Sequence, residues 1–121
     1  MKKNKYGRIV NIASIFGVIS REKRAAYSST KSGLIGLTKA TAHDLAKDNI
    51  LVNSISPGFI NTELTKNILG EKSMKEISSS IPLKRLGDPD EIAKLVLFLT
   101  SDQNTYITGE NIIIDGGYTI A

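Results

Sequence analysis

Three short apolar runs that alternate with helical segments constrain the fold more than any other feature of this sequence. The runs at 8–13 (RIVNIA), 50–56 (ILVNSIS) and 111–115 (NIIID) are rich in β-branched residues, which is typical of buried strands in a parallel sheet. Between the first two, residues 26–47 repeat apolar side chains at spacings of three and four, which predicts a helix. This order indicates an α/β fold whose parallel strands are joined by right-handed crossovers.

The predicted helix over 26–47 has two kinds of face. One repeats, at spacings of three and four, Leu34, Leu37, Thr38, Thr41 and Leu45. Small residues between Ser28 and Gly36 suggest close packing of the helix against another element.

Capping residues mark further helices after the second strand. Thr62 is placed to cap a short helix that ends near Gly70, and residues 71–80 predict another. The run from Asp88 to Glu91 predicts a stronger start, with an aspartate at the N-cap, proline at the first helical position and glutamate at the capping-box position. That helix should reach about Thr100, and its apolar run over 95–99 predicts burial on more than one side.

Three strands make a thin sheet for this class of fold. The first strand opens the sequence almost at once, with nothing before it to cover its outer edge. An apolar sheet with an uncovered edge is expected to be part of a larger one.

Composition excludes several classes of site. The 121 residues include no cysteine and a single histidine, His43, so disulfides and thiolate metal sites are excluded and no metal is expected. The net charge of +4 is spread along the chain without clustered aromatic residues, which favours a solvated surface over nucleic-acid binding. No apolar run has the length of a signal-peptide core or a membrane span, so we expect a cytoplasmic protein with no membrane partner.

Tyr27 and Lys31 are the first candidates for chemistry. They lie four residues apart in the predicted helix and therefore on one face. An ammonium beside a phenol favours the phenolate, which makes the tyrosine a proton donor and acceptor suited to neutral pH. Roughly 0.4 pairs of this kind are expected by chance in such a sequence, so the pair alone is weak evidence.

The ends of the first two strands strengthen this interpretation. Ser14 follows the first strand, and a loop from there can bring its hydroxyl back to the start of the helix that carries Tyr27. Both hydroxyls could then bond to one carbonyl oxygen at the edge where open α/β sheets bind ligands. The second strand ends at Gly58, which would let a ligand approach the backbone, and Thr62 leads into a helix N-terminus, where phosphate binds well.

In order and spacing, the motifs resemble the short-chain dehydrogenase/reductase family over essentially the whole chain. They are IVNIAS, YSSTKSGLIGLTK, VNSISPGFINT, GDPDEIA and ITGENIIIDGG. The subgroup that they resemble most contains 3-oxoacyl-acyl-carrier-protein reductases and related sugar and alcohol dehydrogenases.

The resemblance implies an oxidoreductase that transfers hydride between NAD(P)H and a small-molecule carbonyl or alcohol. Tyr27 would be the general acid/base, Lys31 would assist it and bind the nicotinamide ribose, and Ser14 would polarise the carbonyl. The cofactor would be NAD or NADP, with NADP favoured by the subgroup, and the protein would form a homo-oligomeric dimer or tetramer. The nicotinamide and its adjoining phosphate would be lined by Pro57, Gly58, Ile60 and Thr62.

The sequence also departs from the family pattern. It lacks the TGxxxGxG turn and the NAG motif, so residues 1–121 correspond to the C-terminal half of a Rossmann-type doubly wound sheet without the dinucleotide-binding half. Two interpretations stay open. The chain is part of an NAD(P)-dependent reductase, or it is a truncated or split-gene product that acts only as an interaction module or with a complementary half.

Overall fold

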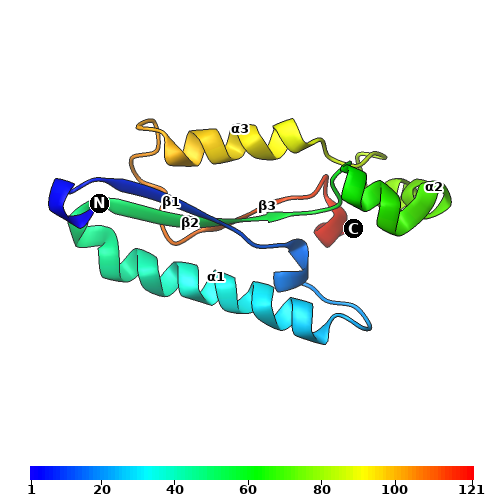
Figure 1. The fold of residues 1–121 in the computed structure, drawn as a ribbon, viewed down its shortest axis with the longest axis horizontal. Helices are drawn as coiled ribbons and strands as arrows, with labels where there is room; N and C mark the ends of the chain where they lie inside the picture. Colours follow the sequence, from blue (N-terminus) through cyan, green and yellow to red (C-terminus); the bar gives the residue numbers. More distant parts are fainter.

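The computed structural model describes residues 1–121 as an α/β fold built on one parallel sheet. Its strands are β1 (Gly7–Ile12), β2 (Ile50–Pro57) and β3 (Asn111–Ile114), in the spatial order β1-β2-β3. Helix α1 (Ala25–Leu45) covers one face of the sheet and α3 (Pro89–Thr100) covers the other, while α2 (Glu63–Ser80) lies beyond the carboxyl ends of the strands (Figure 1). The predicted parallel α/β architecture is therefore confirmed.

The core lies along the central strand. Ile50, Val52 and Ile55 are at most 1% exposed, because β2 pairs on both sides and is covered on both faces. Ala42 of α1 is buried with Ile50 and Val52. Burial of an isoleucine or valine side chain such as those of β2 stabilises the fold by about 1.5–3 kcal/mol.

The capping residues of α2 and α3 act as their sequence predicts. The Thr62 hydroxyl accepts a hydrogen bond from the Thr65 N–H at 3.1 Å. Gly70 has φ 72° and ψ 164°, so it separates α2 into two helical segments. Pro89 opens α3, and the Glu91 carboxylate accepts a hydrogen bond from the Asp88 N–H at 2.8 Å.

The burial expected for α3 is wrong within this chain. Only Leu99 of the apolar run is buried, while Leu97 is 70% exposed and Phe98 is 39% exposed. One face of the helix packs on the sheet, and no other segment covers the opposite face. None of the helices combines the length and apolar character needed to cross a membrane.

The packing expected for α1 is wrong in part. Thr38 of the predicted face is buried, but Leu37 is 58% exposed, because the side of α1 that is buried centres on Thr38 and Ala42. The small-residue stretch packs on nothing in the chain at Gly33 and Gly36, where an added Cβ would meet no atom within 4 Å.

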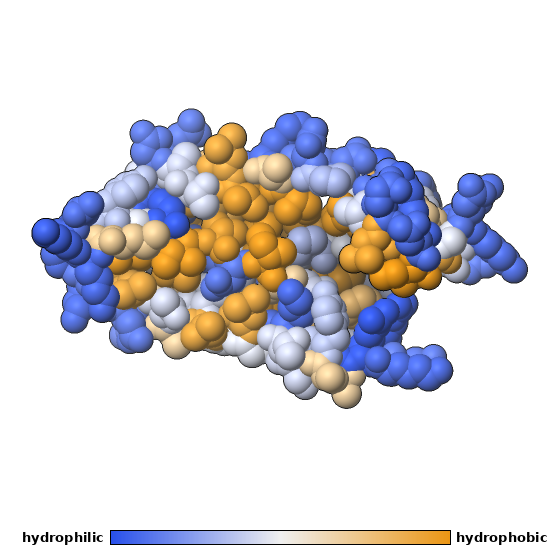
Figure 2. Space-filling view, viewed as in Figure 1, coloured by the Kyte–Doolittle hydropathy of each residue, from blue (hydrophilic) through white to orange (hydrophobic).

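Strand β1 lies at the edge of the sheet, as the sequence predicts. The Ala13 N–H donates to the Ile55 carbonyl at 2.8 Å, so the N–H and C=O groups of alternate residues such as Ile12 point away from β2. Figure 2 shows an apolar band across this side of the molecule, between α1 and α3. Part of the apolar surface of the sheet is therefore open.

Candidate functional site

A cleft lies beyond the carboxyl ends of β1 and β2. Its volume is about 240 Å³. Its walls come from the turn after β1, the start of α1, the turn after β2 and the first segment of α2. Ligands of open α/β sheets bind at this edge because the strands end there and expose free polar groups.

Ser14 lies in this cleft with a hydroxyl that is free to donate. It caps a short 3₁₀ turn over Ile15–Gly17, and its Oγ accepts a hydrogen bond from the Phe16 N–H at 3.2 Å. The residue is only 7% exposed. Because Oγ is used as an acceptor, its own hydrogen remains available for a ligand oxygen.

Tyr27 lies in the first turn of α1 and lines the same cleft. Its ring packs edge to face on Phe16, with the centroids 6.4 Å apart. The residue is 41% exposed, and its hydroxyl makes no hydrogen bond within the chain. The phenol is therefore held by its ring while its oxygen is free for a reactant.

Lys31 lies one turn after Tyr27 in α1 and is not among the residues that line the cleft. Its Nζ lies 5.7 Å from the centroid of the Tyr27 ring and donates a hydrogen bond to the Ile12 carbonyl at 2.9 Å. That carbonyl points to the open edge of the sheet. An ammonium has three N–H donors, so two remain for other partners.

Residues of the segment after β2 line two different cavities. Gly58 and Phe59 line the main cleft. Ile60 instead lines a second cavity of about 100 Å³, and neither Pro57 nor Thr62 lines either cavity. The structure thus brings Ser14, Tyr27 and Gly58 together, and it does not gather the other expected cofactor contacts around the same space. Their role stays a prediction.

Close packing against the C-terminal turn explains why position 58 is a glycine. An added Cβ would lie 2.7 Å from the Asp115 Cβ and 2.8 Å from its Cα. The Gly58 N–H also donates to the Ile114 carbonyl at 3.0 Å. The sequence suggested that Gly58 lets a ligand approach its backbone. On this side of Gly58, Asp115 makes that close approach instead.

The donor set suits one end of a dinucleotide. Free donors on Ser14, Tyr27 and Lys31 match the oxygen atoms of a reacting carbonyl and a ribose. Cradling a pyrophosphate needs an open glycine-rich turn. The Gly116-Gly117 turn is closed, since an added Cβ at Gly116 would lie 2.8 Å from the Ile81 side chain and one at Gly117 would lie 3.0 Å from Pro82.

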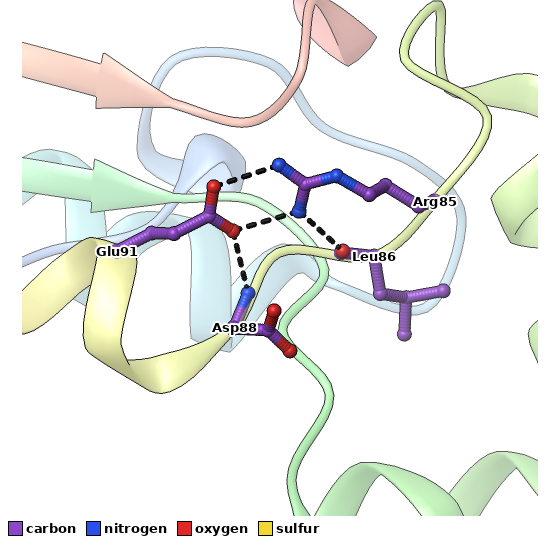
Figure 3. Close-up of polar contacts among 4 residues, drawn as sticks. All are labelled: Arg85, Leu86, Asp88 and Glu91. Carbon is purple, nitrogen blue, oxygen red and sulfur yellow. Dashed lines mark hydrogen bonds and ion pairs between the residues drawn. The ribbon is translucent and has the colours of Figure 1, made fainter.

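An ion pair beside the second cavity holds the turn after β2 in place. The Arg85 guanidinium donates two bonds of 2.7 Å to the Glu91 carboxylate and a third, at 3.1 Å, to the Leu86 carbonyl (Figure 3). The next residue, Gly87, bonds through its N–H to the Phe59 carbonyl at 3.0 Å and through its carbonyl to the Asn61 N–H at 2.8 Å. The Arg85 guanidinium, together with the Asp88 N–H, lowers the pKa of Glu91 to about 2.

Sequence reasoning missed several residues of the site. The capping box identified Glu91, but nothing in the spacing indicated Arg85 as its partner. Arg21 and Arg24 line the main cleft, although the distribution of charge along the sequence suggested only a solvated surface. Convergence of such residues depends on loop paths that a single sequence does not reveal.

Known proteins match nearly the whole chain. Residues 1–119 match a family model described as Enoyl-(Acyl carrier protein) reductase. The 3-oxoacyl-[acyl-carrier-protein] reductase FabG of Aquifex aeolicus (strain VF5) is 48% identical over 117 residues, which cover 97% of this chain and 47% of that protein. The chain thus spans about half the length of the curated relatives that it matches.

Solved structures agree with this partial coverage. ElxO with NADP bound superposes with a TM-score of 0.93 at 41% identity, covering 100% of this chain and 50% of the other. A 4-hydroxyisoleucine dehydrogenase complexed with NADH gives a TM-score of 0.90 at 45% identity, covering 98% and 50%. The three-stranded sheet therefore matches half of a larger Rossmann-type fold, as expected.

Proposed function

The chain belongs to the short-chain dehydrogenase/reductase family, and we propose that it forms the catalytic second half of an NAD(P)-dependent carbonyl reductase. The observation that carries the proposal is the pair of hydroxyls on Ser14 and Tyr27. Both line one cleft at the carboxyl ends of parallel strands, and both are free to donate. A first half that binds the rest of the dinucleotide completes the enzyme.

The residues of the cleft divide the work of carbonyl reduction. A nicotinamide cofactor, when bound, would supply the hydride for the carbonyl carbon. Ser14 donates a hydrogen bond to the carbonyl oxygen and holds it in place. Tyr27 transfers its hydroxyl proton to that oxygen as the carbon–oxygen π pair becomes an alkoxide, which leaves a phenolate that takes its next proton from solvent.

Lys31 assists Tyr27 electrostatically. Its ammonium lies near the phenol ring and stabilises the negative charge that remains after proton transfer. Its two free N–H groups are available for the ribose hydroxyls of the cofactor, while the bond to the Ile12 carbonyl fixes the direction of the side chain. Pro57, Gly58, Ile60 and Thr62 would adjoin the nicotinamide half when the two halves assemble.

Relatives support NADP and NAD as the cofactor class. The matched structures include ElxO with NADP bound and a 4-hydroxyisoleucine dehydrogenase complexed with NADH. We favour NADP because 3-oxoacyl-[acyl-carrier-protein] reductases from Aquifex aeolicus and Thermotoga maritima are 48% and 45% identical to this chain. The substrate is a small carbonyl compound, and the assembled enzyme is a homo-oligomer.

A second interpretation is that these 121 residues are not catalytic alone. It is favoured by the open edge of β1 and by the exposed apolar face of α3, where Leu97 is 70% exposed. In that state the chain would act through contacts with another polypeptide. A cytoplasmic setting stays a prediction.

A cofactor titration with and without a supplied first half tests the proposal. We expect the chain alone to bind NADPH and NADH very weakly, because no open turn in it cradles a pyrophosphate. Co-expression with the first half of the Aquifex aeolicus relative should restore binding and NADPH-dependent reduction of a simple ketone. Calorimetry showing a low-micromolar Kd for the monomeric chain alone would contradict the need for a second half, and an assembled pair without reductase activity would contradict the proposed reaction.

A further inference from the structure

Two arginines converge on the ring that supports Tyr27. The guanidinium carbons of Arg21 and Arg24 lie 5.2 Å and 5.7 Å from the centroid of the Phe16 ring. The same ring contacts Tyr27 edge to face. Both arginines line the cleft that contains Ser14 and Tyr27, so two positive charges lie beside the candidate reacting groups.

Neither arginine forms an ion pair within the chain. The cleft is lined by twelve residues, and none of them is Asp or Glu. The three ion pairs of the chain are Lys5–Asp48, Lys66–Glu63 and Arg85–Glu91. Stacking on an aromatic face uses the flat side of a guanidinium and leaves its N–H donors free at the rim.

The path of the loop separates this pair from an ordinary run of surface charge. Lys23 lies between the two arginines in sequence, yet it is not part of the cleft wall. It has φ 60°, a left-handed conformation that reverses the local direction of the chain. Arg21 and Arg24 therefore reach one side while Lys23 does not.

The wall contributed by α2 is different in character. Leu64 and Ile68 line the cleft one helical turn apart and are 69% and 67% exposed. Leu69 adds a third apolar side chain. The cleft thus combines a cationic wall, an apolar wall and two free hydroxyls.

We propose that Arg21 and Arg24 select a substrate that carries an anionic group, a carboxylate or a phosphate, in addition to its carbonyl. Guanidinium groups bind both anions through paired, charge-assisted hydrogen bonds. The apolar part of the substrate lies against α2. The carbonyl chemistry rests on the proposed function, whereas binding of the anion does not.

Matched charged and neutral ketones test this anion site. We expect levulinate to shift the amide resonances of Phe16, Gly17 and Tyr27 in the full chain and to bind about tenfold more tightly than methyl levulinate. Dihydroxyacetone phosphate is compared with dihydroxyacetone in the same way. The anion, carboxylate or phosphate, that gives the larger increase in affinity over its neutral partner is the one that the site prefers. Because the site is open to solvent, the preference should weaken as salt is added.

Substitutions assign the preference to the two arginines. The double variant Arg21→Gln/Arg24→Gln should bind charged and neutral ketones equally, while Lys23→Gln, which removes one charge from the same loop, should keep the preference. Equal binding of charged and neutral ketones by the unaltered chain, or an undiminished preference in the double variant, would overturn the proposal.

Kinetics of the chain assembled with a first half give a second readout. The double variant should lower kcat/KM for the charged ketone about 10-fold to 100-fold more than for the neutral ketone, mainly through KM. An equal loss for both ketones would indicate a structural role and overturn the anion site. If the assembled enzyme reduces charged and neutral ketones equally well, the anion site is overturned and the proposed function stands. If the chain keeps its binding preference for charged ketones but no ketone is reduced, the anion site stands and the proposed function is contradicted.

Discussion

Arg85 and Glu91 form a bidentate ion pair in which each of the two terminal guanidinium nitrogens lies 2.7 Å from one carboxylate oxygen. The pair brackets Gly87, because Arg85 also binds the Leu86 carbonyl and Glu91 also binds the Asp88 N–H. Gly87 in turn forms a parallel bridge with Ile60. A contact outside the cleft therefore fixes the segment that follows β2, which carries part of the cleft wall.

This ion pair should make stability depend on pH in the acidic range. The pKa of Glu91 is about 2 in the folded chain, below the usual value of 4.5, so the unfolded chain takes up the proton first as pH falls. The stabilising contribution is fully present above about pH 4.5 and is lost between there and about pH 2. Urea unfolding at several pH values should show a smaller acid loss for Glu91→Gln than for the unaltered chain.

The control for that comparison is Glu76→Gln in α2, since Glu76 forms no ion pair. It should keep the acid dependence of the unaltered chain. Superimposable pH profiles for Glu91→Gln and the unaltered chain would show that the ion pair does not affect stability.

Gly58→Ala should destabilise the chain by about 1–3 kcal/mol, because overpacked side chains force shifts of this size. The new Cβ would lie 2.8 Å from the Asp115 Cα, and backbone there cannot move cheaply. Gly36→Ala is the matched control, since its Cβ meets nothing within 4 Å in the middle of α1. That change should stabilise the chain by about 0.5–1 kcal/mol, so thermal unfolding should move in opposite directions for the two variants.

Tyr27→Phe should reduce turnover of the assembled enzyme by about 10²–10⁴ while leaving cofactor binding nearly intact. The ring contact with Phe16 is kept and only the proton donor is removed. Tyr106→Phe is the control, because Tyr106 is 96% exposed and lies outside the cleft. Steady-state kinetics with a wild-type kcat for Tyr27→Phe would remove this residue from the proposed mechanism.

The isolated chain should self-associate. Strand β1 has an unpaired edge, and Leu37 of α1 and Leu97 of α3 are 58% and 70% exposed. Open edges and contiguous apolar surface favour pairing with another chain. Sedimentation should show species larger than the monomer, and Leu37→Lys or Leu97→Lys should reduce association through the helix concerned. A stable monomer at micromolar concentration would contradict this expectation.

Local sequence determined the elements of this fold and the positions of its candidate catalytic groups. The β-branched runs, the cap at Thr62, the break at Gly70 and the start of α3 at Pro89 all lie where their sequence predicts. These features depend on neighbours within a few residues, so propensity and spacing are enough to find them. The motif order was equally informative, because it placed Ser14 and Tyr27 at one end of the sheet.

Tertiary structure alone decided which surfaces meet. Leu97 has the same apolar character as Leu99, yet only Leu99 is buried, because packing on the sheet selects one face of α3. Gly58 is explained by Asp115, which lies 57 positions away in the sequence. Arg21 and Arg24 reach the cleft only because the chain reverses at Lys23 and Phe16 provides a ring for both. Such contacts depend on how segments far apart in the sequence come together in space, and local sequence patterns do not predict them.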